Sequence, residues 1–499
     1  MRSIEGSLSF FINFSTPDLL PRIALVPLFP GLRRFKQGRN FQQWTGNDSK
    51  AFMKVFVTSL EGFVPIDIIK ALTAFLEFCY IARLDTISES SLASLDDALR
   101  KFHHHRKIFQ ESGVRPTGFS LPRQHALTHY HYHIKRFGAP NGLSSSITES
   151  KHIAAVKKPW RQSSHHEALN QMLTINTRND KLAAAHVDFS TRGMLNGTCL
   201  GEAIKKHFAL EGTTGSDNVE DDQDEDGDDG QDLDADEDDE TGPVDGPTIL
   251  SDVYLARKRG KAFFSAPTTI SHDFIARGYP LTSFQALGRH IKQENLEALV
   301  RVFLFYQENP AFNGTPPISA CPTTEGVQDI SVFHSAKAIF SAPSNNSGVE
   351  GLYRETIRST PRWLTSGITA PRRDCVLIAT GSAVAGVRGL EVARVHLLFS
   401  FVLKDQVFEC ALVHEFCKSF TDPDPDNGLW IFEPDLAEDR SRIMSVVHLD
   451  SIVRAVHLLP VFNGDAPIPR EINFTHTLNV FQSFYLNKYI DYHAFETLC

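Results

Sequence analysis

The spacing of apolar residues changes along the chain and divides it into regions of different predicted structure. In the first part, apolar side chains recur every three or four residues, the period of an amphipathic helix. The pattern predicts helices over 47–62, 66–84, 89–112 and 122–137, the last with Pro122 at its first position. This part of the chain is therefore expected to be mainly helical, with little β structure.

Two further helices are expected around a polar stretch at residues 144–161. Thr148 can cap a helix that begins at Glu149, and Pro159 is expected to end that helix after about three turns. Ser163 or Ser164 can cap the next helix, which is expected to run to about His186. Its predicted buried side chains are Leu169, Met172, Leu173 and Leu182.

The period of the pattern changes in the second half of the chain. Residues 250–312 have helical spacing, strongest from Ser283 to Tyr306, and residues 307–370 are expected to be irregular because they are rich in Pro, Ser, Thr, Gly and Asn. From Ala393 to Phe416 apolar and polar residues alternate on both sides of Lys404–Gln406, which predicts a β-hairpin. Short strands are expected at 429–432, 445–448 and 457–462, and a terminal helix from Thr477 to Glu496.

These patterns predict an α+β protein with four regions. They are a helical region (1–205), a disordered acidic linker (206–249), a helical segment with an irregular connector (250–365), and a small antiparallel β-barrel-like domain with a C-terminal helix (366–499).

Composition narrows the class of protein. The 499-residue chain is 41% hydrophobic, which is ordinary for globular domains, and no run of about 18 apolar residues predicts a membrane span. The seven cysteines include no Cys-x-x-Cys pair, which argues against a zinc knuckle and is typical of a reducing compartment. The sequence contains neither a Gly-x-Ser-x-Gly elbow nor a phosphate-binding loop, so a common hydrolase has little support.

The formal net charge of −10 conceals a strong asymmetry. Between Asp217 and Glu240 there are 16 acidic residues and no lysine or arginine, and the rest of the chain has 44 acidic against 50 basic residues. The acidic segment has too few apolar side chains to offset the entropy of ordering and is predicted to be a disordered, solvated linker. The functional alternatives are binding of a basic partner protein and self-inhibition by mimicry of phosphate. The mildly basic remainder permits contact with nucleic acid.

The candidate chemistry lies in the polar stretch, where one carboxylate is followed by several cations. Glu149 near a helix N-terminus could hold a divalent metal, while the cations that follow it could bind phosphates. The candidate DNA-binding residues are Lys151, His152, Lys157, Lys158, Trp160 and Arg161. The alternative is an ordinary solvated start of a helix, where an acidic side chain is common.

Histidines suggest a second, weaker possibility. His125, His129 and His133 are spaced four residues apart on one predicted helix, and two such histidines can share a metal ion. A third ligand at a convincing spacing is missing from the neighbouring sequence, so a plain polar surface is the preferred interpretation.

Several blocks of sequence resemble the Plavaka-type transposases, which belong to fungal DNA transposons allied to the KDZ and CACTA groups. Around the polar stretch the similar blocks are Leu121–His125, Phe137–Gly142, Ser145–Ile153, Lys158–Arg161 and Lys181–Phe189. Upstream they are Phe29–Phe35 and Gln43–Lys50, and downstream His448–Arg454 and Tyr485–Asp491.

The resemblance implies a cut-and-paste DNA transposase with an RNase H-like nuclease core that uses acidic residues and Mg²⁺ or Mn²⁺. Glu149 matches the late catalytic and metal-binding carboxylate of that core. In the family, earlier catalytic aspartates and a zinc-finger region precede the Phe29–Phe35 block, which here begins about thirty residues from Met1. The chain is therefore expected to correspond to the C-terminal part of a transposase, with a helical remnant of the core and no catalysis by itself, since a two-metal site needs several carboxylates.

The expected partners are DNA at transposon ends and no membrane, and the expected location is the nucleus. The alternative function is a non-enzymatic module, repurposed from a transposase, that binds chromatin or another protein.

Overall fold

The computed structural model describes most of the chain outside its N-terminal and acidic segments. The described residues are 19–35, 46–143, 152–192, 242–243, 251–255, 283–310, 312, 314–345, 351–365, 368–380, 386–462, 468–469 and 471–499. Residues 242–243, inside the predicted linker, form a short strand, whereas the acidic run itself lies outside the described residues.

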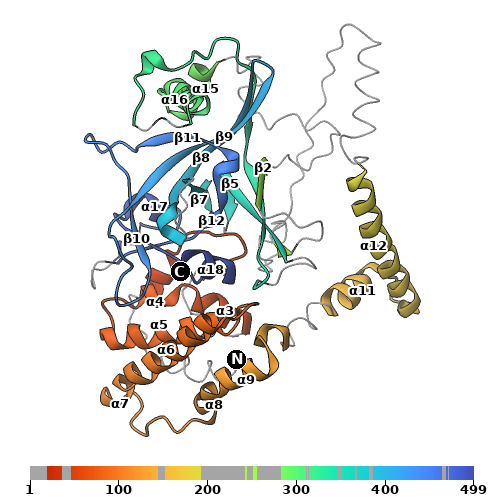
Figure 1. Ribbon diagram of the computed structural model, residues 1–499, viewed down its shortest axis with the longest axis vertical. Coiled ribbons are helices and arrows are strands. Elements are labelled where there is room, and N and C mark those ends of the chain that lie inside the picture. The colour runs from red at the N-terminus through yellow and green to blue at the C-terminus, as the bar shows by residue number, and fades with distance from the viewer. Residues whose placement is uncertain are drawn as a thin grey trace.

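The regular structure described up to residue 192 is helical and, apart from Leu19–Ala24, lies where the periodicity predicts helices, although the stretches 47–62, 89–112 and 122–137 are each interrupted. The larger group of these helices lies below the sheets in Figure 1. Ser88 caps one helix by accepting a hydrogen bond from the Ser91 amide at 3.1 Å, and Gly138, at φ 87°, ends another. The helices are α2 Leu19–Ala24, α3 Gly46–Met53, α4 Phe56–Ser59, α5 Ile66–Ile81, α6 Glu89–His105, α7 Ile108–Glu111, α8 Pro122–Ala126, α9 Tyr130–Phe137, α11 Lys158–Gln162 and α12 Ala168–Thr191. Whether this region derives from an RNase H-like core stays a prediction.

The C-terminal half contains a nearly closed antiparallel sheet, as predicted. Nine described strands form it in the order β12-β7-β8-β9-β10-β14-β13, with β3 paired to β8 and β11 to β9. Its two end strands are consecutive in the chain and separated by His457 alone, so one residue brings the ends of the sheet together. The strands are β3 Gln328–Phe333, β7 Cys375–Ala379, β8 Leu390–Leu403, β9 Gln406–Lys418, β10 Trp430–Pro434, β11 Met444–His448, β12 Ile452–Val456, β13 Leu458–Pro460 and β14 Phe484–Leu486.

The predicted hairpin over 393–416 is confirmed. Strands β8 and β9 pair in antiparallel register across a tight turn in which Lys404 (φ 52°) and Asp405 (φ 63°) are left-handed. The register slips between Val395 and Leu397, so His396 is the extra residue of a β-bulge.

A smaller antiparallel sheet lies beside the first, where residues 250–370 were predicted to be partly helical and partly irregular. Its strands are β1 Gly242–Pro243, β2 Ser251–Leu255, β4 Ser335–Ser341, β5 Leu352–Thr365 and β6 Ile368–Arg373. The start of the predicted helical segment is thus a strand, and much of the expected irregular connector is sheet. The proline content was a poor guide to structure here. Pro361 lies at a register shift of β5, a position in a strand where the missing amide proton costs little.

The predicted terminal helix from Thr477 to Glu496 was also wrong. The segment forms α17 Thr477–Val480, strand β14 and α18 Tyr492–Leu498. All three residues of β14 are buried between β10 and β13, so ladder hydrogen bonds and packing on both sides replace a helix there.

Apolar packing joins the helices to the sheets. One cluster of buried residues extends from Ile23 to Leu498 and includes α5, α6 and the inner face of the larger sheet. The predicted helix at 283–306 is present as α15 Phe284–Ile291 and α16 Leu296–Glu308, which cover the other face through a second cluster. Phe284 packs edge-on against Phe401 at a ring distance of 5.2 Å.

Polar contacts also connect the first helices to the last strands. The His457 ring, 1% exposed, donates from Nε2 to the Pro27 carbonyl at 3.1 Å and accepts from Asn487 at Nδ1. Lys488 pairs with Glu77 at 3.0 Å, and the Tyr80 hydroxyl donates to the Tyr489 carbonyl.

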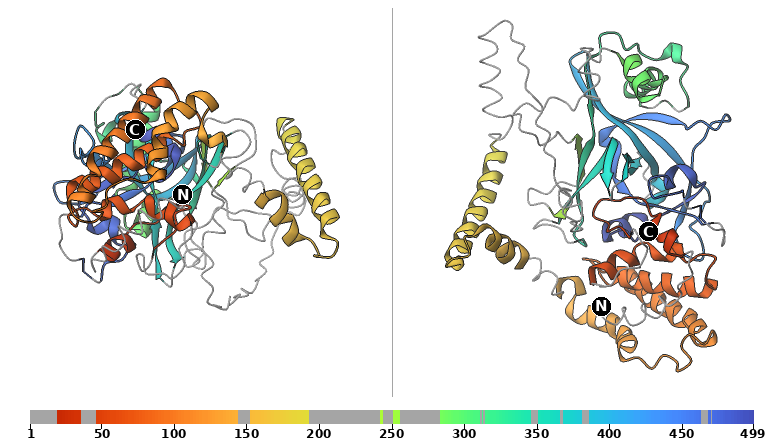
Figure 2. Two further views of the ribbon diagram at one scale, coloured as in Figure 1. Left: turned by 90° about the horizontal axis from the view of Figure 1, so that it is seen from below. Right: turned by 180° about the vertical axis from the view of Figure 1, so that it is seen from behind.

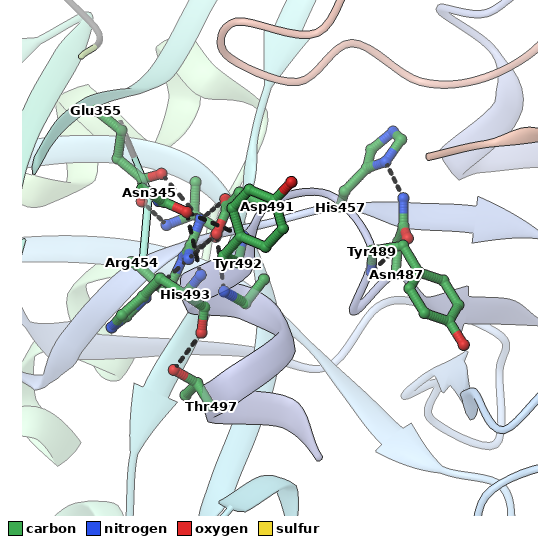
Figure 3. A network of polar contacts seen from close by, with 12 residues as sticks. Asn345, Glu355, Arg454, His457, Asn487, Tyr489, Asp491, Tyr492, His493 and Thr497 are labelled. Carbon is green, nitrogen blue, oxygen red and sulfur yellow. Dashed lines mark hydrogen bonds and ion pairs between the residues drawn. The ribbon is translucent and has the colours of Figure 1, made fainter. Parts of the chain in front are cut away.

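A buried ion network links β5, β12 and α18 (Figure 3). The guanidinium of Arg454 is 1% exposed and pairs with Asp491 at 2.5 Å and with Glu355 at 3.3 Å. It also donates to His493 Nδ1 and to the Ala455 carbonyl, so all five of its N–H groups are used. Burial raises the pKa of Glu355 to about 7, against the opposing charge of Arg454.

Replacing the central cation should destabilise the fold strongly. In Arg454→Leu, Glu355 and Asp491 would stay buried without their partner, and we expect the free energy of unfolding to fall by about 3–5 kcal/mol. Chemical denaturation measures the difference. The control is Arg388→Leu, which breaks an exposed pair with Asp422 and should cost at most about 1 kcal/mol. Equal effects of the two substitutions would contradict a structural role for the network.

The His457 contact should make stability depend on pH. Burial lowers the pKa of His457 to about 4, although its bond to the Pro27 carbonyl opposes this shift. In the unfolded chain His457 takes up a proton near pH 6.5. The stability that its neutral form contributes is therefore fully present above that pH and is lost as the pH falls towards 4. One such proton contributes about 1.4 kcal/mol per pH unit within that window.

We therefore expect the His457→Gln variant to lose less stability between pH 6 and pH 4.5 than the wild-type protein. Other buried titratable groups are common to both proteins and cancel in the comparison. Denaturation curves across this range measure the two slopes, and His166→Gln, at an exposed histidine, is the control. Identical slopes for wild type and His457→Gln would show that His457 is not the group responsible.

Candidate nucleic-acid interface

The structure describes five of the seven candidate site residues. Glu149 and Lys151 lie outside the described residues, so the catalytic and metal-binding roles of Glu149 stay predictions. The others, His152, Lys157, Lys158, Trp160 and Arg161, lie on one short helical stretch, His152–Arg161, which we call the basic segment.

The basic segment does not end at Pro159, as the sequence suggested. It begins with a π-helical turn, Ile153–Lys157, and Pro159 lies in the first turn of α11, where a missing amide proton costs little. The chain therefore continues as helix to Gln162. Asn176 of α12 donates to the Ala155 carbonyl at 2.8 Å, which fixes the segment to the following helix.

The basic segment and α12 stand away from the sheets and the other helices in all three views (Figures 1 and 2). This position explains why the predicted burial of α12 was wrong: Leu169, Leu173 and Leu182 are 68%, 56% and 68% exposed. The helical period was correct, but more than half of each of these leucine side chains is exposed in the described structure.

The cations of the basic segment are exposed and have no partner in the part of the chain that the structure describes. Lys157, Lys158 and Arg161 have neither a hydrogen bond nor an ion pair to any described residue. Some exposed cations elsewhere are neutralised, since Arg100 and Lys101 both pair with Asp97, whereas others, such as Arg440, have no described side-chain partner. The basic segment therefore carries positive charge that the described protein leaves available.

An aromatic side chain accompanies these cations. Trp160 is 45% exposed and stacks on His165, with ring centroids 4.8 Å apart and planes at 14°. The turn that holds His165 is strained, since His165 (φ 64°) and Glu167 (φ 45°) are both left-handed. An exposed, oriented indole between cations has the chemistry that stacks on an unpaired base.

The histidines of the fourth predicted helix lie on its exposed side. His125 and His129 bring their Nε2 atoms to 3.3 Å, and the rings of His129 and His133 are 6.2 Å apart. Among the described residues, no group of three or more His, Cys, Asp or Glu side chains is arranged to hold a metal ion. Those residues also include no helix that could span a bilayer.

Sequence reasoning missed the buried network around Arg454. Arg454 ends the block His448–Arg454 and Asp491 ends the block Tyr485–Asp491, so two separate blocks of the stated resemblance meet in one ion pair. The signal available in the sequence was an arginine at the end of one short block and an aspartate at the end of another. Glu355 gave no signal of its own, and its 1% exposure makes it a structural carboxylate rather than part of an open site.

Comparisons of this chain with models of protein families, with curated proteins and with solved structures give no match.

Proposed function

We propose that this protein is derived from a cut-and-paste transposase and binds DNA through the basic segment. The observation that carries the proposal is a set of three exposed cations, Lys157, Lys158 and Arg161, that have no partner among the described residues, on a helical stretch that stands away from the sheets and the other helices. Three such cations can each neutralise one phosphate and release its counterion.

Contacts within the protein hold the backbone of the basic segment and orient Trp160, while the side chains of its cations stay exposed. The bond from Asn176 to Ala155 holds the π-helical turn, and Trp160 is oriented by its stack on His165. Pre-orientation reduces the entropy lost when flexible side chains are immobilised on a ligand. The transposase origin is supported by the sequence blocks that resemble that family, and nuclear location follows from the same proposal.

A second candidate, binding of a partner protein, is favoured by α12. This helix exposes Leu169 and Leu173 on one face and Leu182 and Phe189 on the opposite side, and apolar side chains exposed on two sides of a helix usually mark a surface that another chain covers. The DNA measurements below separate the two candidates.

Removal of the three cations should weaken DNA binding and its dependence on salt. We expect the variant Lys157→Gln/Lys158→Gln/Arg161→Gln to reduce the slope of log affinity against log salt by about 2–3, because about 0.9 counterions are released per neutralised phosphate. Fluorescence anisotropy with a labelled random-sequence duplex, at several salt concentrations, measures both slope and affinity.

The matched control removes three exposed cations that the protein already neutralises. These are Arg100 and Lys101, paired with Asp97, and Lys135, paired with Glu89. The control variant should keep the wild-type slope. If the two triple variants behave alike, the basic segment is not the DNA contact, and the partner-protein function is favoured.

Trp160 should give the interface a preference for single strands. Trp160→Ala is expected to lower affinity for a single-stranded oligonucleotide by about 1–3 kcal/mol and to affect duplex binding less, because stacking needs an unpaired base. The same anisotropy assay measures both probes. Tyr132→Ala, at a 58% exposed aromatic side chain on α9, is the control. Equal losses on single strands and duplex would indicate that Trp160 packs within the protein and does not stack on bases.

A further inference from the structure

A group of arginines and histidines gathers on the larger sheet, far along the chain from the basic segment. Its members are Arg373 at the end of β6, Arg394 and His396 on β8, His414 on β9, and Arg442 just before β11. We call these five residues the arginine–histidine cluster. Arg394 and His414 are direct cross-strand partners, and the rings of His396 and His414 are 6.1 Å apart.

Two of the guanidinium groups converge on one atom. Arg394 Nη1 donates to Asn479 Oδ1 at 2.8 Å, and Arg442 Nη2 donates to the same oxygen at 2.6 Å. Two like charges are therefore held within a few ångströms of each other by a neutral amide oxygen. Arg373 has no hydrogen bond or ion pair from its side chain to any described residue, although its carbonyl accepts from Arg394 Nε at 3.3 Å.

The carboxylates near the cluster do not balance this charge. Asp374 is already engaged, since it accepts from Arg372 Nε at 3.0 Å and from the Arg358 amide at 2.9 Å. Asp435 offers its carbonyl oxygen to His414 Nε2 at 3.1 Å, and its carboxylate forms no ion pair with an arginine among the described residues. The described groups thus leave an excess of positive charge.

The environment makes this excess costly. Arg394 is 5% exposed, and burial lowers its pKa to about 10. Burial, followed by the charges of Arg373, Arg394 and Arg442, lowers the pKa of His396 to about 2. His396 Nε2 is buried without a hydrogen-bond partner among the described residues, and His396 is the bulge residue of β8, a position where a strand commonly redirects a side chain beside a functional site.

The geometry points to an oxyanion-binding site in which Arg373, Arg394 and Arg442 take a phosphate group. Planar guanidinium forks match the oxygens of phosphate and can bind it through two hydrogen bonds each. The site is open to solvent, because Asn479 is exposed and Arg373 and Arg442 are half-buried. The phosphate can be a free anion or part of a nucleic-acid backbone, and neither source depends on DNA binding by the basic segment.

Calorimetric titration of the full-length protein with inorganic phosphate, at constant ionic strength, tests the site. We expect saturable binding that falls about tenfold or more in Arg442→Gln, because one charge-assisted fork is lost. Arg440→Gln is the control: it removes an exposed cation two residues away that has no described partner, and phosphate affinity should be unchanged. Absence of saturable binding to the wild-type protein, or equal losses in the two variants, would overturn the proposal.

A second variant supplies the anion from within the chain. Asn479→Asp places a carboxylate at the atom that Arg394 and Arg442 already contact, on an exposed side chain whose replacement should not disturb folding. We expect it to raise Tm in phosphate-free buffer and to abolish the phosphate-induced rise of Tm seen in the wild type. A lower Tm, or an undiminished response to phosphate, would contradict the site.

The source of the phosphate is distinguished by a second ligand. A short single-stranded oligonucleotide is titrated into the Lys157→Gln/Lys158→Gln/Arg161→Gln variant, with and without Arg442→Gln. Binding that depends on Arg442 identifies a nucleic-acid backbone as the ligand. Binding of inorganic phosphate without an Arg442-dependent oligonucleotide response identifies a free anion.

Discussion

The position of the last helix depends on one buried charge, the guanidinium of Arg454, whose N–H groups all have hydrogen-bond acceptors. Transfer of an arginine and two carboxylates out of water costs several kcal/mol per ion, and Coulomb attraction recovers this cost only when the geometry is good. Arg454 meets that condition because each of its five N–H groups has an acceptor, and because Asp491 is held by the Ala494 amide at 2.8 Å. Few other arrangements of β5, β12 and α18 would satisfy the same three charges.

This constraint acts on the whole sheet. Arg454 lies on β12, and His457, one residue beyond that strand, joins it to β13 at the other end of the larger sheet. Fixing β12 against Glu355 and Asp491 therefore also fixes where the sheet closes. The same strands also position the N-terminal part of the chain, because His457 donates to the Pro27 carbonyl and Tyr80 of α5 packs on Tyr489 at a ring distance of 5.3 Å.

Local patterns in the sequence predicted those features that depend on local interactions. The hairpin of β8 and β9 was predictable because its alternation and its tight turn lie within one short stretch, and α6 because Ser88 marks its start. The partners of Arg454 lie 37 and 99 residues away, and no local pattern carries such pairings. The strands β4 and β5 were missed for a related reason: sheet partners, rather than composition, decide whether a segment rich in serine and proline becomes a strand.

The candidate site was predictable in its chemistry but not in its shape. Cations and a tryptophan in the basic segment were visible as residues, whereas the π-helical turn and the Trp160–His165 stack depend on contacts with Asn176 of α12 and with the turn before that helix. The exposure of Leu169 was also unpredictable, since periodicity identifies an apolar face but not whether anything covers it.

The arginines of the sheet show how differently one residue type can be used. Arg454 and Arg394 are both buried, yet Arg454 contacts two carboxylates, whereas Arg394 contacts only neutral oxygens among the described residues. The first arrangement completes a fold, because removal of any partner leaves a buried charge uncompensated. The second arrangement leaves positive charge beside Asn479 and Arg442 at the protein surface. An anion from outside the chain would neutralise this charge favourably. The same distinction separates Arg100 and Lys101 of α6, which pair with Asp97, from the cations of the basic segment, which have no partner among the described residues.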